Sequence, residues 1–277
     1  MFVSVIIPTY KGAHFLPQVL KSLKAQSFKD FEVIIIVKPS GDETEGIARK
    51  ICKQFDLQHR ILIQTEGHFT RALNMGIKGS KGDILLFTDD DVILPKNWVK
   101  SHIYNHIRFM KSGAISGQYI NIAPTSGLVS SFKKESLSSK VSRGLRWRLP
   151  LLMIDKPHPL FKKYRLGIYI TQSFRVAKGF YIPHKLCFSL PCRGVNMSFK
   201  RDAIKNIFFP EHPLLKIAPY NEQYLGARIV LEGWESIYDP QIVVYHRVRQ
   251  GLSASTNNIE RRIMSKLFEA LLKEYQL

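Results

Sequence analysis

Three consecutive carboxylates form the feature of this chain with the clearest chemical meaning. Asp89, Asp90 and Asp91 follow directly after the apolar run 84–87. Because adjacent carboxylates repel one another, a fold that places them at the end of a buried strand commonly neutralises them with a cation. A divalent ion that bridges a nucleoside diphosphate would supply that charge. The alternative is an acidic turn that caps the helix expected near Pro95, and the surrounding sequence decides between the two.

The elements around the carboxylates alternate between strands and helices. Branched apolar runs at 3–8 and 31–37 predict parallel strands that are buried on both faces. Helices are predicted at 16–23, 47–55 and 69–77, where apolar residues recur at helical spacing, and a short strand is predicted at 61–65. This alternation predicts an α/β fold with a mainly parallel central sheet and right-handed crossovers.

Polar residues follow several of the predicted strands. Pro8 and Tyr10 come at the end of the first strand, and Ser40 and Asp42 come after the second. In sheets of this kind ligands bind outside the carboxyl ends of the strands. We therefore expect these residues and the Asp triplet to line one crevice.

Four segments, in order along the chain, resemble the successive motifs of family 2 glycosyltransferases. They are Val-Ser-Val-Ile-Ile-Pro-Thr-Tyr at 3–10, Gly-Asp-Ile-Leu-Leu-Phe-Thr-Asp-Asp-Asp-Val at 82–92, Gly-Val-Asn-Met-Ser-Phe at 194–199, and Asn221-Glu222 with Leu225, Arg228 and Gly233 after it. The resemblance covers roughly 1–118 and 190–250. It implies a GT-A fold, which is a Rossmann-like α/β/α sandwich, together with a nucleotide-sugar donor, Mg²⁺ or Mn²⁺, and usually inversion at the anomeric carbon.

The resemblance also implies roles for single residues. Asp89 would approach the donor ribose and Asp91 would hold the metal, while Asp90, on the donor side, would support the site from behind or face solvent. Glu222 stands where the family carries its catalytic base, although Asn221 precedes it here instead of an acid. Asp239 is the nearest rival for the base, but it lies before a proline in an expected turn.

Four more residues receive roles by position. Gly194 and Asn196 resemble the floor of the acceptor site, with a local cap as the alternative for Asn196. His246 follows an apolar strand and resembles a histidine that joins the metal in several GT-A enzymes, with a structural role as the alternative. Asn74 lies on a predicted helix that faces the nucleotide crevice, so we expect it to contact the donor unless it is a helix-internal polar residue.

One segment departs from the family pattern. Family members commonly follow the second strand with Asp-Asp-Gly-Ser, in which an acid binds the uracil or ribose, whereas this chain has Lys38-Pro39-Ser40-Gly41-Asp42. The departure leaves GDP and dTDP sugars open as donors beside UDP sugars. As an alternative to donor binding, Asp42 and Thr44 could cap the following helix.

Most of the net charge of +19 lies in one segment. Residues 126–190 hold 13 Lys and Arg against 2 Asp and Glu, and aromatic and apolar residues lie among them, including Trp147, Leu149, Leu151, Leu152, Phe161 and Tyr164. This composition suits an anionic membrane surface, and it also suits nucleic acid or a polyanionic glycan; the alternative is a solvated basic insertion. We expect no nucleic-acid partner.

We divide the chain into a nucleotide-sugar-binding half at 1–118, a basic insertion at 119–190, a half with the acceptor site and base at 191–250, and a C-terminal helix at 251–277. That helix is predicted from Ile259, Ile263, Leu267 and Leu271. Three cysteines without zinc-type spacing, no leader pattern and no long apolar run favour a cytoplasmic protein, peripheral at the inner face of the membrane.

The expected function is metal-dependent sugar transfer to a hydroxyl of a glycan or lipid-linked acceptor. A non-catalytic protein that binds a polyanion or glycan on the same scaffold is the main alternative. A nucleotidyltransferase is disfavoured because no Gly-rich phosphate loop follows the first strand.

Overall fold

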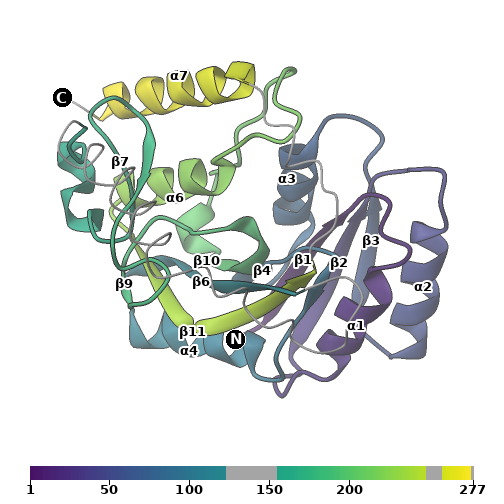
Figure 1. The fold of residues 1–277 in the computed structure, drawn as a ribbon. Helices are drawn as coiled ribbons and strands as arrows, with labels where there is room; N and C mark the ends of the chain where they lie inside the picture. Colours follow the sequence, from purple (N-terminus) through teal and green to yellow (C-terminus); the bar gives the residue numbers. More distant parts are fainter. Residues whose placement is uncertain (123–154, 248–257, 276–277) are drawn as a thin grey trace, which may run out of the picture.

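A computed structural model of the chain describes residues 1–122, 155–247 and 258–275. The strands of its large sheet are β1 (Val3–Thr9), β2 (Phe31–Val37), β3 (His59–Ile63), β4 (Ile84–Phe87), β5 (Val92–Ile93), β6 (Ser112–Ile122), β9 (Cys187–Phe188), β10 (Met197–Lys200) and β11 (Glu235–Arg247). The α-helices are α1 (Leu16–Lys24), α2 (Thr44–Gln54), α3 (Phe69–Gly79), α4 (Trp98–Arg108), α6 (Asn221–Leu231) and α7 (Asn258–Glu274). Figure 1 shows their arrangement.

The large sheet has the order β3-β2-β1-β4-β10-β6-β11-β5, and β9 pairs with β11. Strands β3, β2, β1 and β4 are parallel, as are β6 and β11, whereas β10 runs antiparallel to both of its neighbours. The prediction of an α/β fold with a mainly parallel central sheet is confirmed. The inner strands are mostly apolar because helices cover both of their faces, and the buried Glu32 of β2 accepts a hydrogen bond from Ser4 of β1.

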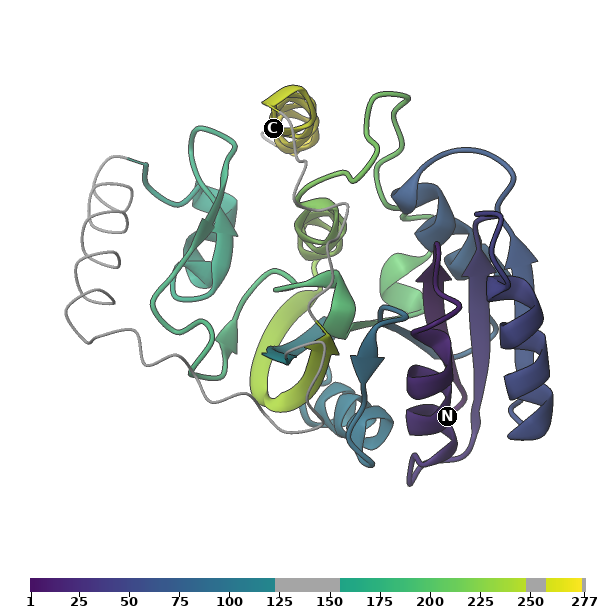
Figure 2. The ribbon, with the colours of Figure 1, turned by 45° about the vertical axis from the view of Figure 1, so that its right-hand side comes forward.

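Helices pack against the two faces of this sheet (Figure 2). On one face, α1, α2 and α4 contribute buried residues to a core with the sheet, and Trp98 of α4 is among the largest of them. On the other face, α3 and α6 enclose a second core around Phe87, Phe199 and Phe209. The chain is therefore an α/β/α sandwich, and its loops at the carboxyl ends of the parallel strands position the candidate site.

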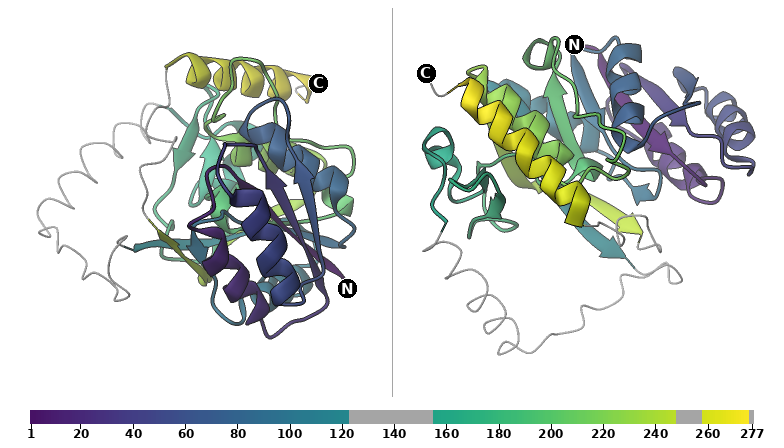
Figure 3. Two further views of the ribbon diagram at one scale, coloured as in Figure 1. Left: turned by 90° about the vertical axis from the view of Figure 1, so that its right-hand side faces the viewer. Right: turned by 90° about the horizontal axis from the view of Figure 1, so that it is seen from above.

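The described part of the basic segment folds against the C-terminal half. It contains the 3-10 helix η1 (Pro159–Tyr164) and a small antiparallel sheet of β7 (Ile168–Ile170) and β8 (Val176–Lys178). Phe161 and Tyr164 are buried here in a third core that α6 and α7 share. Figure 3 shows the backbone of this segment near α6 and α7. The expectation that these two aromatic residues face a partner surface is wrong, because they fill a protein core. The other residues named for that surface, Trp147, Leu149, Leu151 and Leu152, lie outside the described residues.

The predicted C-terminal helix is present as α7, which lies along α6 in the views of Figures 1 and 3. Its buried face is Met264, Phe268, Leu271 and Leu272, whereas Ile259 is exposed. A strict spacing of four drifts by about 40° per step around a helix of 3.6 residues per turn. The prediction of one face from Ile259 to Leu271 is therefore wrong at its first position. None of the described helices combines the length and apolar character needed to cross a membrane.

Candidate active site

The Asp triplet lies in the short connection between β4 and β5. Because β5 pairs antiparallel with the end of β11, with Val92 opposite His246, the triplet is brought next to that histidine. Asp91 Oδ1 lies 3.2 Å from His246 Nε2, and the backbone N–H of Arg247 donates to the carbonyl of Asp91. Two strands that are distant in sequence thus hold the carboxylate and the imidazole together.

Asp89, Asp91 and His246 form a group that fits a divalent cation. One ligand atom from each residue lies within 4.8 Å of the others. Asn121 Oδ1 lies 3.3 Å from His246 Nδ1, so a proton on Nδ1 would leave the lone pair of Nε2 directed at the carboxylates. Two carboxylate oxygens and one imidazole are a donor set that suits Mn²⁺ or Mg²⁺.

Asp90 points away from this group. It is 1% exposed, and its Oδ2 accepts a 2.5 Å hydrogen bond from Thr9 Oγ1 at the end of β1. A Cβ at Gly12 would overlap both of these side-chain oxygens, so the chain needs glycine there. The expectation that Asp90 faces solvent is wrong, whereas its alternative, a group that supports the site from behind, agrees with this bond between the loops after β1 and β4.

The ends of β1 and β2 are joined by a hydroxyl and carboxylate cluster. Ser40 Oγ donates to Asp42 at 2.6 Å, and Thr44 Oγ1 donates to the same carboxylate at 2.7 Å. Ser40 Oγ accepts from Lys11 N–H, and Thr44 Oγ1 accepts from Gly12 N–H. The hydrogen bond from Ser40 leads the effects that lower the pKa of Asp42. Asp42 therefore stays ionised at this edge, where Pro8 is half-buried and Tyr10 is partly exposed.

Lys38 occupies the position where the family pattern carries an acid. Its Nζ donates at 2.9 Å to the carbonyl of Gly67, in the loop before α3. The lysine thus ties the end of β2 to the start of α3.

Asn74 has a structural role. Its Nδ2 donates to the carbonyl of Phe209 and to Glu211 Oε1, and its Oδ1 accepts from Phe209 N–H. Both the Nδ2 and the Oδ1 of this buried amide are hydrogen-bonded to the 209–211 loop. The expectation that Asn74 contacts the donor is therefore wrong.

The side chain of Asn196 likewise makes its hydrogen bonds within the protein. It lies in the 3-10 helix η2 (Gly194–Asn196) and is completely buried. Its Oδ1 accepts from Trp98 Nε1 and lies 3.0 Å from His102 Nε2, and its Nδ2 donates to the carbonyls of Gln118 and Ile242. The expectation of an acceptor contact is wrong for Asn196, whose side chain anchors η2 to α4 and β11. Gly194, in the same turn, is partly exposed.

Glu222 lies in the first turn of α6, two residues after Tyr220, which has φ +69°. Burial raises the pKa of its carboxyl, and the Arg193 guanidinium and the backbone N–H of Gly194 oppose that shift. A carboxylate with a raised pKa is the state expected of a general base. Gln223 beside it donates to the carbonyl of Pro191 and fixes α6 against the chain that leads into η2.

A row of aromatic and cationic side chains connects Glu222 to the metal-binding group. The guanidinium of Arg193 lies 5.1 Å from the centre of the Tyr119 ring, and that ring packs edge to face on His246 at 6.4 Å. Arg193 is exposed and acts electrostatically on Glu222. Sequence reasoning missed Tyr119, because no motif marks it and only the pairing of β6 with β11 brings it to His246.

Asp239 does not compete well for the role of base. It is 4% exposed, and its Oδ1 accepts from the N–H of Gln241 within β11. The carboxylate is held in the strand by this bond.

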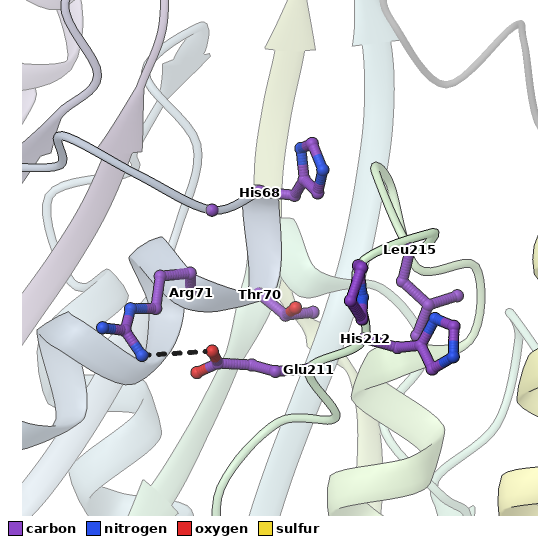
Figure 4. Close-up of a pocket in the computed structure, with 8 residues that line it drawn as sticks. His68, Thr70, Arg71, Glu211, His212 and Leu215 are labelled. Carbon is purple, nitrogen blue, oxygen red and sulfur yellow. Dashed lines mark hydrogen bonds and ion pairs between the residues drawn. The ribbon is translucent and has the colours of Figure 1, made fainter.

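A pocket lies between the start of α3 and the loop that follows η3 (Asp202–Ile204). Figure 4 shows the lining residues, among them His68, Arg71, Glu211 and His212. None of the residues that we expected to bind donor, acceptor or metal lines it.

Comparison with known proteins identifies the sequence family. The profile of glycosyl transferase family 2 matches residues 4–155, more than half of the chain. The chain is 26% identical over 129 residues to glycosyltransferase GlyG of Streptococcus pneumoniae, an alignment that covers 45% of this chain and 41% of that protein. It is 31% identical over 99 residues to the poly(ribitol-phosphate) beta-N-acetylglucosaminyltransferase TarS of Staphylococcus aureus, which covers 35% of this chain and 17% of TarS.

Solved structures show the same fold. Residues 1–349 of S. aureus TarS in complex with UDP match with a TM-score of 0.64 and 19% identity, covering 100% of this chain and 67% of that one. The mannosyltransferase PcManGT from Pyrobaculum calidifontis, in complex with GDP-Man and Mn²⁺, matches with a TM-score of 0.63 and 19% identity, covering 98% and 64%. These matches confirm the expected GT-A fold. In the sequence alignments the chain spans less than half the length of GlyG and of TarS.

Proposed function

Because the chain belongs to glycosyl transferase family 2, we propose that it transfers a sugar from a nucleotide-sugar donor to a hydroxyl group, with a divalent cation and with inversion. The observation that carries the proposal is the meeting of Asp89, Asp91 and His246 at the carboxyl ends of the strands. A partly exposed carboxyl of raised pKa, Glu222, is linked to this group through Arg193 and Tyr119.

Glu222 is the general base of the proposed reaction. It accepts the proton of the acceptor hydroxyl as the oxygen attacks the anomeric carbon, and a single displacement of this kind inverts the configuration. Arg193 lowers the cost of the ionised form of Glu222. A divalent ion held by Asp89, Asp91 and His246 would neutralise charge on the leaving nucleoside diphosphate.

The donor half of the site is proposed at the ends of β1 and β2. Pro8, Tyr10, Ser40 and Asp42 lie at this edge, with Asp89 close to the metal-binding group. The solved relatives were studied with UDP-GlcNAc and with GDP-Man, so they differ in the nucleobase. With Lys38 in place of the usual acid, we propose a nucleotide-sugar donor without assigning its base.

For the acceptor we propose a glycan or lipid-linked molecule, reached past Gly194 at an anionic membrane surface. The excess of +11 charges in 126–190 supports this partner class. TarS, which acts on poly(ribitol-phosphate) by its name, is an example of a relative with an anionic acceptor.

The test is donor binding and donor hydrolysis with a panel of UDP, GDP and dTDP sugars, each with and without Mn²⁺. At least one donor should raise the melting temperature, because a ligand that binds only the folded state stabilises it. The protein should also release nucleoside diphosphate slowly without acceptor, whereas a binding protein on the same scaffold releases none.

In Asp91→Asn we expect the Mn²⁺-dependent part of the donor-induced stabilisation to disappear, because the carboxylate ligand is lost. Asp30→Asn, an exposed acid outside the site, is the matched control and should behave as the wild type. Donor affinity that is the same with and without metal in all three proteins would remove the metal from the proposal.

A further inference from the structure

The pocket beside α3 has a volume of about 370 Å³ and is lined by both polar and apolar groups. Its lining residues are Gly67, His68, Thr70, Arg71, Glu211, His212, Pro213 and Leu215. Figure 4 shows that they come from two segments, the start of α3 and the 211–215 loop, which face each other across the pocket.

The wall at the start of α3 is held in place by hydrogen bonds. Gln64 Nε2 donates to the carbonyls of Glu66 and His68, and Lys38 Nζ donates to the carbonyl of Gly67. Gly67 has φ +76°, and a Cβ there would press on the side chain of Arg71. The turn into α3 therefore has a defined shape that a side chain at 67 would disturb.

The opposite wall is fixed to the same helix. Asn74 binds the backbone of Phe209 on both its amide atoms and also Glu211 Oε1. Further along, the N–H of Phe69 points to the carbonyl of Lys216 at 3.4 Å. Both walls of the pocket are thus attached to α3.

Thr70 is the residue that points to a ligand. It is 2% exposed and lines the pocket, yet within the described parts of the chain neither its hydroxyl nor its backbone N–H has a hydrogen-bond partner. The Thr70 hydroxyl is not among the fully enclosed side-chain atoms without a partner, so it opens onto the pocket, where a ligand can bond to it. His212 adds another donor, because its Nδ1 accepts from the N–H of Leu214 and the proton of the neutral ring is then on Nε2.

The electrostatics of the pocket favour an anion. Thr70 lies in the first turn of the eleven-residue helix α3, where the unpaired N–H groups and the helix dipole attract negative charge. The acid in the pocket is already engaged, since Glu211 Oε1 accepts from Asn74 and Oε2 accepts from Arg71. Figure 4 shows the imidazole of His68 pointing away from Thr70 and Glu211.

We propose that this pocket binds a phosphate group, held by the hydroxyl and N–H of Thr70 and by the imidazole of His212. For the source of the phosphate the proposal rests on the proposed function, under which the donor carries a diphosphate and an anionic acceptor carries a phosphodiester. The Lys38 contact to Gly67 joins the pocket to the donor edge of the sheet.

The test is a titration of the full chain with inorganic phosphate at constant ionic strength, followed by the amide resonance of Thr70 in NMR spectra. We expect a saturable shift. Thr70→Val keeps the shape of the side chain and removes the hydroxyl, and His212→Gln removes the imidazole. Each should weaken binding about tenfold, the scale of one hydrogen bond to a charged group. The Thr70→Val titration is followed through its neighbours in α3.

His184→Gln, an exposed histidine outside the pocket, is the matched control and should bind phosphate as the wild type does. Phosphate affinity that is unchanged in Thr70→Val and His212→Gln, or a wild type that shows no saturable shift, overturns the proposal. Melting temperatures of all variants separate loss of binding from loss of fold.

Titration with UDP and GDP in the presence of phosphate distinguishes the sources. If UDP or GDP displaces phosphate, the pocket binds the diphosphate of the donor. If the nucleotides and phosphate bind independently, the pocket binds the phosphate of another substrate. A wild type that binds phosphate but hydrolyses no donor contradicts the proposed function alone, whereas donor hydrolysis without phosphate binding contradicts the pocket alone.

Discussion

Glu222 and Arg193 determine the acid–base chemistry of the site at the scale of single residues. Burial raises the pKa of the Glu222 carboxyl, and the guanidinium of Arg193 opposes the shift. Glu222 therefore has two properties that a general base requires. Its raised pKa gives it affinity for the proton of a hydroxyl, and the nearby cation keeps part of the population ionised.

In Glu222→Gln we expect turnover to fall by roughly 100-fold or more, the usual scale for loss of a general base. Donor affinity should change little, because the amide keeps the size of the side chain. Because folding raises the pKa of Glu222, the free energy of unfolding of the wild type falls as the pH rises and this carboxyl ionises. The Gln variant has no such charge, so at neutral pH it should be at least as stable as the wild type. Transfer rates, donor titrations and urea unfolding measure the three quantities. If Glu222→Gln keeps wild-type turnover, the general base is another residue, and Asp239 is the next one to test.

Arg193→Gln should move the acid limb of the pH profile of kcat/KM to higher pH. Without the guanidinium, burial acts on Glu222 unopposed by that charge, its pKa rises further, and the ionised base is lost earlier as the pH falls. Arg193→Lys should restore much of the original profile, and Arg49→Gln, on the exposed face of α2, should not move it. An unshifted acid limb in Arg193→Gln would show that the arginine does not act on the base.

At the scale of elements, a buried network of polar side chains holds η2 and β10 against α4. His102 Nδ1 and His106 Nε2 lie 2.8 and 2.9 Å from Ser198 Oγ, and His106 Nδ1 lies 3.2 Å from Ser112 Oγ. Through His102 and Trp98 the network reaches Asn196, two residues from Gly194. The turn beside Glu222 is thus held in place by buried groups of the protein interior.

Burial lowers the pKa of His102 to about 4 and that of His106 to about 3. Both rings stay neutral in the folded protein, whereas in the unfolded chain they take up a proton near pH 6.5. The free energy of unfolding should therefore fall as the pH drops below about 6.5, with each histidine adding about 1.4 kcal/mol per pH unit to the slope until its folded pKa is reached.

Urea unfolding of wild type and His106→Gln at several pH values between 6 and 4.5 measures this slope. We expect the variant to lose one histidine's share of the slope in addition to any constant loss of stability from the altered hydrogen bonds. Equal slopes in the two proteins would mean that His106 is not held neutral by the fold.

Periodicity predicted the elements well where apolar residues are continuous or recur at helical spacing. The strands 3–8 and 31–37 and the carboxylate triplet at a strand end are examples, and β3 begins only two residues before the predicted start. Motif position was a weaker guide to side-chain direction. Asn74, Asp90 and Asn196 were expected to meet substrates, but each is buried and bonded to distant backbone or side chains. Such pairings depend on strand order and loop path, which local pattern does not contain.

At the scale of the whole molecule, the chain combines a site rich in carboxylates with a strongly basic segment. The site uses Asp89, Asp91 and Glu222, while residues 126–190 carry an excess of +11 charges. In the described part of that segment Phe161 and Tyr164 belong to the third core, whereas Leu160, Phe180 and Leu186 are exposed beside the cations. Long side chains such as Lys156, Lys162 and Lys185 are exposed there.

We expect the protein to bind vesicles of anionic lipid at low salt and to leave them as salt shortens the screening length. Each Lys or Arg near an anionic surface contributes about 1 kcal/mol, so a triple change of Lys156, Lys162 and Lys185 to Gln should weaken binding strongly. The matched control changes Lys21, Lys24 and Lys50, on α1 and α2, to Gln, which removes the same charge from another face. Flotation with neutral and anionic vesicles at low and high salt measures the effect. If both triple variants lose binding equally, the attraction depends on net charge alone and not on this segment. If the protein does not bind anionic vesicles but binds heparin tightly, its partner is a polyanionic acceptor and not a membrane.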